Sequence, residues 1–164
     1  MSMVIYLRRA TAADIARLTD SPSDFERFAF EDGDQADDIV DFDKAWDALD
    51  FLLTGTPRTT DDPLAIIAAD GELFGVDEHG FGGFSIISPD RMAAFARALE
   101  AVSDEQLAAR YDPAAMERED IYLADFFVEE GADALDYILQ GVPALRRFAA
   151  SCAAKGEGAL RILA

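Results

Sequence analysis

The sequence predicts a single domain of the α+β class, with a small β-sheet packed against several α-helices. Its 164 residues suffice for one domain of ordinary size, which buries about two-thirds of its surface on folding. Hydrophobic residues make up 51% of the chain, including 12 Phe, and this content excludes a disordered acidic protein. Short apolar runs of strand composition are interspersed with segments of helical periodicity, and no repeat or linker divides the chain.

Three segments have the composition of strands. Residues 3–7 form a continuous apolar run, which is typical of a strand covered on both faces. Residues 84–87 (Phe-Ser-Ile-Ile) follow a glycine-rich, loop-like segment at residues 61–83, and residues 159–163 follow Gly156 and Gly158. We expect these three strands to form the sheet.

Capping residues mark where most of the helices begin. A hydroxyl or carboxylate at the cap accepts hydrogen bonds from the first free N–H groups of a helix, and a proline just after it loses nothing. The last helical stretch, residues 132–154, contains Gly141 and Pro143, which predict a kink or two helices. The expected caps are Thr11 with Asp14, Ser21 before Pro22, Ser88 before Pro89, Ser103 with Gln106, and Asp112 before Pro113.

The strongest helix signal covers residues 42–54. Apolar side chains recur there at i, i+4, i+7 and i+11, which predicts one buried stripe. Gly55 stands where a left-handed cap is expected, and Pro57 prevents continuation. We expect the stripe to meet the apolar faces of two later helices in one core, made of Phe42, Trp46, Leu49, Leu53, Phe95, Leu99 and Phe148.

The chain is strongly acidic. It carries 14 basic and 33 acidic residues, a formal charge of −19, which argues against nucleic acid or an anionic membrane as a partner. Residues 31–50 hold nine acids for a net −8, and residues 117–136 hold eight for a net −7. We call these stretches the first and second acidic windows. Two interpretations are open: a solvated, solubilising surface, or a surface that attracts cations or a basic partner.

Further exclusions follow from what the sequence lacks. No run approaches the ~20 apolar residues of a membrane helix, and residues 1–9 do not read as a signal peptide. A single cysteine, Cys152, excludes a disulfide framework and a multi-cysteine metal site. We therefore expect a soluble cytoplasmic protein without a cofactor or a metal.

Three aspartates of the 42–54 helix are the strongest candidates for a site. Asp43, Asp47 and Asp50 recur at i, i+4 and i+7, so we expect them to share one stripe. The stripe could be a solvated helix face, a recognition surface, or a set of carboxylates that share a hard cation or raise one another's pKa. Trp46 is either a core residue or, if partly exposed, a ligand platform.

Other residues with chemical potential carry weaker signals. His79, beside Asp77 and Glu78, could bind a metal or move a proton, but such a loop usually just faces water. Cys152 lies among alanines on an apolar helix face, which favours a structural thiol. Gly80, Gly82 and Gly83 lack the Gly-Lys-Ser/Thr of a phosphate loop and lead into a strand, which favours a turn.

The segment Asp43-Lys-x-Trp-Asp-x-Leu-Asp-Phe-x-Leu-Thr-Gly55 resembles the YfbM-like family of bacterial proteins. Four further features carry the resemblance: the opening Met-x-Met-x-x-Tyr-Leu, Asp-Pro-Leu at 62–64, the glycine-rich approach to Ser88-Pro89, and Glu-Asp-Ile-Tyr at 119–122. The resemblance implies a compact α/β/α sandwich and no established activity. It also implies that relatives often carry histidine where this chain has Asp50. Tyr122 would then either project its hydroxyl into a cleft beside the aspartates or lie in the core.

Two function hypotheses follow. The first is a binding module whose acidic windows dock a basic partner, as inhibitors of cationic nucleases or toxins do. The second is an enzyme or small-molecule binder with a pocket built from residues 43–54, the glycine-rich loop and Tyr122. If the two windows form one convex surface, the first gains; if their carboxylates converge in a concave pocket, the second gains.

Overall fold

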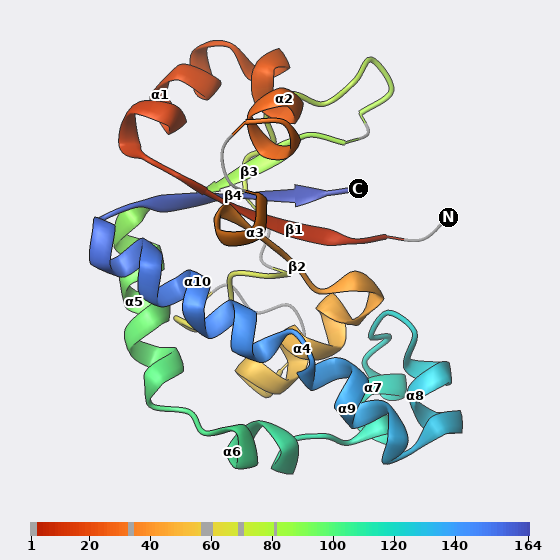
Figure 1. Cartoon of the computed structure of the whole chain (residues 1–164). Coiled ribbons are helices and arrows are strands. Elements are labelled where there is room, and N and C mark those ends of the chain that lie inside the picture. The colour runs from red at the N-terminus through yellow and green to blue at the C-terminus, as the bar shows by residue number, and fades with distance from the viewer. Residues whose placement is uncertain (1–2, 33–34, 57–60, 69–70, 81) are drawn as a thin grey trace.

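In the computed structural model, which describes residues 3–32, 35–56, 61–68, 71–80 and 82–164, a four-stranded antiparallel sheet lies between two layers of helices (Figure 1). The strands are β1 (Ile5–Ala10), β2 (Ile39–Asp41), β3 (Phe84–Ile87) and β4 (Gly158–Leu163), in the order β2-β1-β4-β3. The first and last strands pair along their whole length, from Ile5 opposite Leu163 to Ala10 opposite Gly158. The α+β class expected from the sequence is confirmed.

Four of the five caps that the sequence indicates are confirmed, whereas Ser21 precedes the 3₁₀ turn at Pro22 without a side-chain cap hydrogen bond. Thr11 and Ser103 form capping boxes, and Ser88 and Asp112 accept from backbone N–H groups of their helices. The helices are α1 (Ala12–Asp20), α2 (Phe25–Phe30), α3 (Gln35–Asp38), α4 (Trp46–Thr54), α5 (Pro89–Glu100), α6 (Asp104–Ala109), α7 (Pro113–Arg118), α8 (Ala124–Glu130), α9 (Asp133–Leu139) and α10 (Val142–Lys155), with 3₁₀ turns η1 (Pro22–Asp24) and η2 (Asp43–Ala45).

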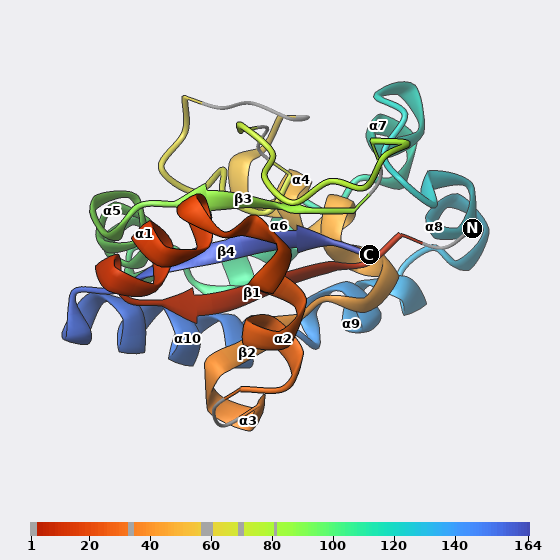
Figure 2. The same cartoon turned by 90° about the horizontal axis from the view of Figure 1, so that it is seen from above.

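The two faces of the sheet bury separate apolar clusters. On one face, α1 and α2 cover β1, β3 and β4, and the cluster contains Leu18, Phe25 and Phe28 (Figure 2). On the other face, Ile5, Leu7 and Val40 point into a larger cluster shared with α4, α5 and α10. The strand expected at residues 3–7 is therefore covered on both sides, although it begins two residues later and ends three residues later. The three layers match the α/β/α expectation.

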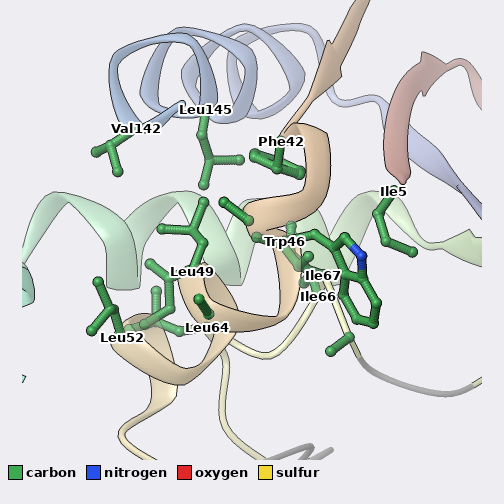
Figure 3. Close-up of a cluster of buried hydrophobic side chains, with 14 of the residues drawn as sticks. Ile5, Phe42, Trp46, Leu49, Leu52, Leu64, Ile66, Ile67, Val142 and Leu145 are labelled. Atoms are coloured by element: carbon green, nitrogen blue, oxygen red, sulfur yellow. The ribbon is translucent and has the colours of Figure 1, made fainter. Parts of the chain in front are cut away.

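Helix α4 lies in the middle of the larger cluster. Figure 3 shows its side chains between Val142 and Leu145 of α10 and the segment that carries Leu64, Ile66 and Ile67. Gly55 ends the helix with φ +74, the left-handed cap that the sequence indicates. The predicted core is confirmed, because all seven of its members lie in this cluster: Phe42, Trp46, Leu49, Leu53, Phe95, Leu99 and Phe148.

The structure contains elements that the sequence does not indicate. The sequence predicts a loop over residues 31–41, where the structure has α3 and the three-residue strand β2, which pairs with β1 through Leu7 opposite Val40. Helix α8 is not indicated by the sequence either. The helical stretch of residues 132–154 is two helices, α9 and α10, separated at Gln140 and Gly141, which is one of the two outcomes that Gly141 and Pro143 predict. Gly33, expected in a loop, and Pro57, expected to end a helix, lie outside the described residues.

Candidate functional site

The three aspartates of the predicted stripe do not form a common surface. Asp47 is 0% exposed and Asp50 is 1% exposed, whereas Asp43 is exposed and precedes α4 in the turn η2. Their carboxylates contact three different segments of the chain. The expectation of a solvated carboxylate stripe on one rigid helix is therefore wrong for Asp47 and Asp50.

The buried carboxylates hold loops against α4. One oxygen of Asp47 accepts the backbone N–H of Tyr122 at 2.8 Å, and one oxygen of Asp50 accepts the backbone N–H of Ala68 at 3.3 Å. A buried backbone donor needs such a partner, because leaving it unpaired costs about 1–3 kcal/mol. These two aspartates thus have a structural role in this fold. Changing them to asparagine should therefore alter the stability of the fold, whereas the same change in a solvated stripe would be neutral.

The sequence of α4 itself indicates that these two aspartates are buried. From Trp46 to Leu53 every residue of α4 is buried, and Asp47 and Asp50 are the only charged ones among them. A helix that is apolar on all sides lies inside a protein, and polar residues within it must find partners there. The segment around Ala68 and the turn at Tyr122 supply those partners from far away in the sequence.

Trp46 and Tyr122 form a junction with the N-terminal strand. Trp46 is 8% exposed, and its Nε1 donates to the carbonyl of Met3 at 3.0 Å. The rings of Trp46 and Tyr122 stack with centroids 5.8 Å apart, and the Tyr122 hydroxyl accepts from the Met3 N–H at 3.3 Å. Both aromatic side chains therefore hold Met3 in place just before β1. Trp46 is a core residue rather than an exposed ligand platform.

Asp43, in the first acidic window, is tied to α9, on which the second window ends. The Tyr137 hydroxyl on α9 donates to Oδ2 of Asp43 at 2.7 Å. Burial and this hydrogen bond to a carboxylate raise the pKa of Tyr137 to about 12, so the phenol stays protonated and the link persists across physiological pH. Asp43 and Tyr137 also line a hollow of about 270 Å³ together with Gln140 and Gly141. This hollow differs from the expected pocket, which placed Asp43 beside Tyr122 and the glycine-rich loop.

All eight acids of the second acidic window are exposed. The window covers the end of α7, the whole of α8 and the start of α9; these helices pack on one another at one end of the molecule, with α9 also against α4 (Figures 1 and 2). On α8 two apolar side chains face solvent, Phe126 at 41% and Val128 at 44% exposure. We call Asp43 together with the second-window acids the acidic face; these acids are Glu117, Glu119, Asp120, Asp125, Glu129, Glu130, Asp133 and Asp136, all exposed.

The remaining candidates have structural explanations. His79 is 71% exposed in a turn, with its Nε2 3.4 Å from Glu78. Cys152 is buried, and burial raises the pKa of its thiol to about 12, so it is protonated and unreactive at neutral pH. At Gly83, φ is +88 and an added Cβ would lie 2.5 Å from the carbonyl oxygen of Phe74, so this glycine serves a tight turn before β3.

Within the described ranges the structure has neither a metal-binding cluster nor a membrane-spanning helix. No group of three or more His, Cys, Asp or Glu side chains is arranged to hold a metal ion. Of the helices in that part of the chain, none combines the length and apolarity needed to cross a bilayer.

Comparison with known proteins identifies the family. The chain matches a family model described as a domain of unknown function, DUF1877, over residues 1–162. Its structure is similar to the crystal structure of YfbM from Escherichia coli, a protein of unknown function, with a TM-score of 0.72 and 20% sequence identity over 98% of this chain and 99% of that one. No curated protein matches the sequence significantly. The chain therefore belongs to the DUF1877 family, whose YfbM-like fold it shares and to which no reaction is assigned.

Proposed function

We propose that the protein is a binding module that docks a basic protein partner on its acidic face. The observation that carries the proposal is the 2.7 Å hydrogen bond between Tyr137 and Asp43, because it ties the first acidic window to α9, the helix that carries the last two acids of the second window. A field of one sign over such a surface speeds the encounter with an oppositely charged partner and orients it. A cytoplasmic location is part of the proposal.

Apolar anchors within the acidic face support binding beyond simple charge attraction. Phe126 and Val128 are exposed on α8 beside Asp125 and Glu129. The Phe126 ring packs edge-on against Phe127, with centroids 5.7 Å apart at 70°, so little side-chain freedom remains to be lost on binding. An aromatic residue inside a charged rim is the arrangement in which a few residues supply most of the affinity.

The test compares two triple variants of equal net charge. The face variant carries Asp125→Asn, Glu129→Gln and Glu130→Gln, and the matched control carries Glu72→Gln, Glu78→Gln and Glu100→Gln, which are exposed acids outside the face. Partners are captured from an extract of the source cells at low and high salt, then purified and measured by surface plasmon resonance. We expect a basic partner whose association rate falls with salt and falls about tenfold in the face variant but not in the control.

A second variant separates specific docking from charge attraction. Phe126→Ala should speed the dissociation of that partner without changing the salt dependence of its association, because the anchor acts after the encounter. Equal losses in the face and control variants would mean that net charge alone attracts the partner, and the proposal would be wrong. A partner that is not basic would refute it as well.

A further inference from the structure

A cavity of about 420 Å³ lies between α10 and the edge of the sheet formed by β1 and β2. This volume is within the usual range of small-molecule sites, about 300–1,000 Å³. Arg147, Ser151 and Lys155 line it from α10, where their spacing of four residues places them on one face of the helix. Arg9 of β1 and Asp37 of α3 line the opposite side.

Arg9 forms a fixed wall of this cavity. Its guanidinium contacts the carboxylates of Asp38 and Glu157, the latter at 3.0 Å, and is thereby neutralised. It also donates to Oγ of Ser151 at 2.6 Å. Because that bond uses Ser151 as an acceptor, and no acceptor for its own proton is found among the described residues, the hydroxyl remains able to donate to a ligand.

In the described part of the structure, Arg147 and Lys155 lack the ion pairs and backbone hydrogen bonds that hold most other cations in place. Neither has a carboxylate within 4.0 Å in the described part of the structure, although the protein carries 33 acids. The arginines that donate to backbone carbonyls, and so have structural roles, are Arg8, Arg91, Arg110, Arg146 and Arg161.

The charge of the cavity therefore opposes that of the molecule. Arg8 and Arg9 together balance Asp38 and Glu157, so among the described lining residues Arg147 and Lys155 face one further carboxylate, that of Asp37. An anion placed between the two cations would form charge-assisted hydrogen bonds, which are about twice as strong as neutral ones. The helix rises about 12 Å from Arg147 to Lys155, and both long side chains can reach a group held beside Ser151.

We propose that this cavity binds a small organic anion that carries a phosphate or carboxylate group. Arg147, Lys155 and the Ser151 hydroxyl bind the anionic group, and the apolar body lies against Phe148 and Val40, which also line the cavity. The site is separate from the acidic face and does not depend on the proposed partner. Arg9 orients Ser151 without using its own charge on the ligand.

The binding experiment uses four probes measured by isothermal titration calorimetry: phenyl phosphate, benzoate, inorganic phosphate and benzylamine. We expect phenyl phosphate or benzoate to bind with inorganic phosphate weaker, and benzylamine, which has the same ring with a cation, not to bind. The probe that binds tightest identifies the anionic group. Tightest binding of benzylamine, or no binding of any probe at millimolar concentration, would overturn the proposal.

Matched variants locate the binding in the cavity. Arg147→Gln with Lys155→Gln should weaken the tightest probe about tenfold or more, since it removes both charge-assisted hydrogen-bond donors. Arg97→Gln with Arg118→Gln removes the same charge from exposed positions that do not line the cavity and should change the affinity little. All four residues are exposed, so both variants should fold, which circular dichroism and melting temperature verify.

Two further variants distinguish a cavity from a charged surface. Asp37→Asn removes the opposing carboxylate and should tighten binding several-fold, whereas weaker binding would mean that the ligand uses this carboxylate, contrary to the proposal. Ala144→Phe fills the cavity beside Arg147 without changing charge and should abolish binding of the phenyl probes. Unchanged binding in a folded Ala144→Phe variant would show that the cations act from the open surface and would overturn the cavity site.

Discussion

The two acidic windows are alike in length and charge, yet the structure buries two acids of the first window and none of the second. In the first window, Asp47 and Asp50 are buried and accept backbone N–H groups from residues 68 and 122. In the second window, all eight acids are exposed. The comparison teaches that charge density along a sequence does not predict where the charges lie. What decides is whether the residues between the acids are apolar on all sides of the helix, as they are in α4.

Trp46 of the first window and Phe126 of the second are both aromatic, and exchanging each for alanine should give the largest difference in stability. Trp46→Ala should lose about 3–5 kcal/mol of unfolding free energy, close to the whole stability of a modest domain, because the ring is buried between Met3 and Tyr122. Phe126→Ala should change it by no more than about 0.5 kcal/mol. Chemical denaturation measures both. Equal losses of unfolding free energy in the two variants would mean that the burial of Trp46 does not stabilise the fold more than the exposed Phe126 does.

The next largest difference in stability should come from replacing the acids of the two windows. Asp47→Ala and Asp50→Ala should each cost about 1–3 kcal/mol, since each leaves a backbone N–H of a covering loop without its acceptor. Glu129→Ala and Glu130→Ala, in the last turn of α8, should be neutral or slightly stabilising, because a carboxylate there faces the negative end of the helix. Thermal unfolding of the four variants tests this, and a neutral Asp47→Ala would contradict a structural role.

Salt should act on the second window more than on the first. Raising the salt concentration from about 20 to about 300 mM should raise the melting temperature by a few degrees, because it screens repulsion between exposed acids. In the Asp125→Asn, Glu129→Gln, Glu130→Gln variant the increase should be smaller. A melting temperature that does not depend on salt in the wild-type protein would mean that its exposed charges are already well dispersed.

The smallest expected effect on stability concerns the hydrogen bond between Tyr137 and Asp43. The pKa of Tyr137 is raised to about 12 in the folded protein, from an ordinary value of 10.0. The folded state therefore favours the neutral phenol. The resulting stabilisation is fully present below about pH 10 and is lost as the pH rises toward 12. Tyr137→Phe should flatten the fall of stability over that interval, as pH-dependent denaturation will show. An equally steep fall in the variant would assign it to other groups.

Local signals predicted most of the fold. Strand β3 has the predicted bounds, and the caps Thr11, Ser88, Ser103 and Asp112 function as their side-chain chemistry indicates. What failed depends on contacts between distant segments. Strand β2 has three residues in an acidic stretch and exists because β1 pairs with it, so its own composition gives little indication of a strand.

The candidate site was less predictable for the same reason. The burial of Asp47 and Asp50 depends on two segments that no spacing on α4 reveals. The cavity beside α10 combines a stripe visible in the sequence, at 147, 151 and 155, with Arg9 and Asp37 from other elements. Helical spacing gives one wall of a site, whereas the opposite wall comes from the topology of the sheet.

The pairing of β1 with β4 has a consequence for synthesis on the ribosome. These central strands lie about 150 residues apart, so they cannot pair before β4 has been synthesised. At about 5–20 residues per second, β1 waits roughly 8–30 seconds for its partner, with an apolar edge open to other strands. A circular permutant that joins residue 164 to residue 3 through a short linker would make β4 and β1 a local hairpin. The shorter loop lowers the entropy cost of forming that pair, so the permutant should fold faster while retaining the native contacts.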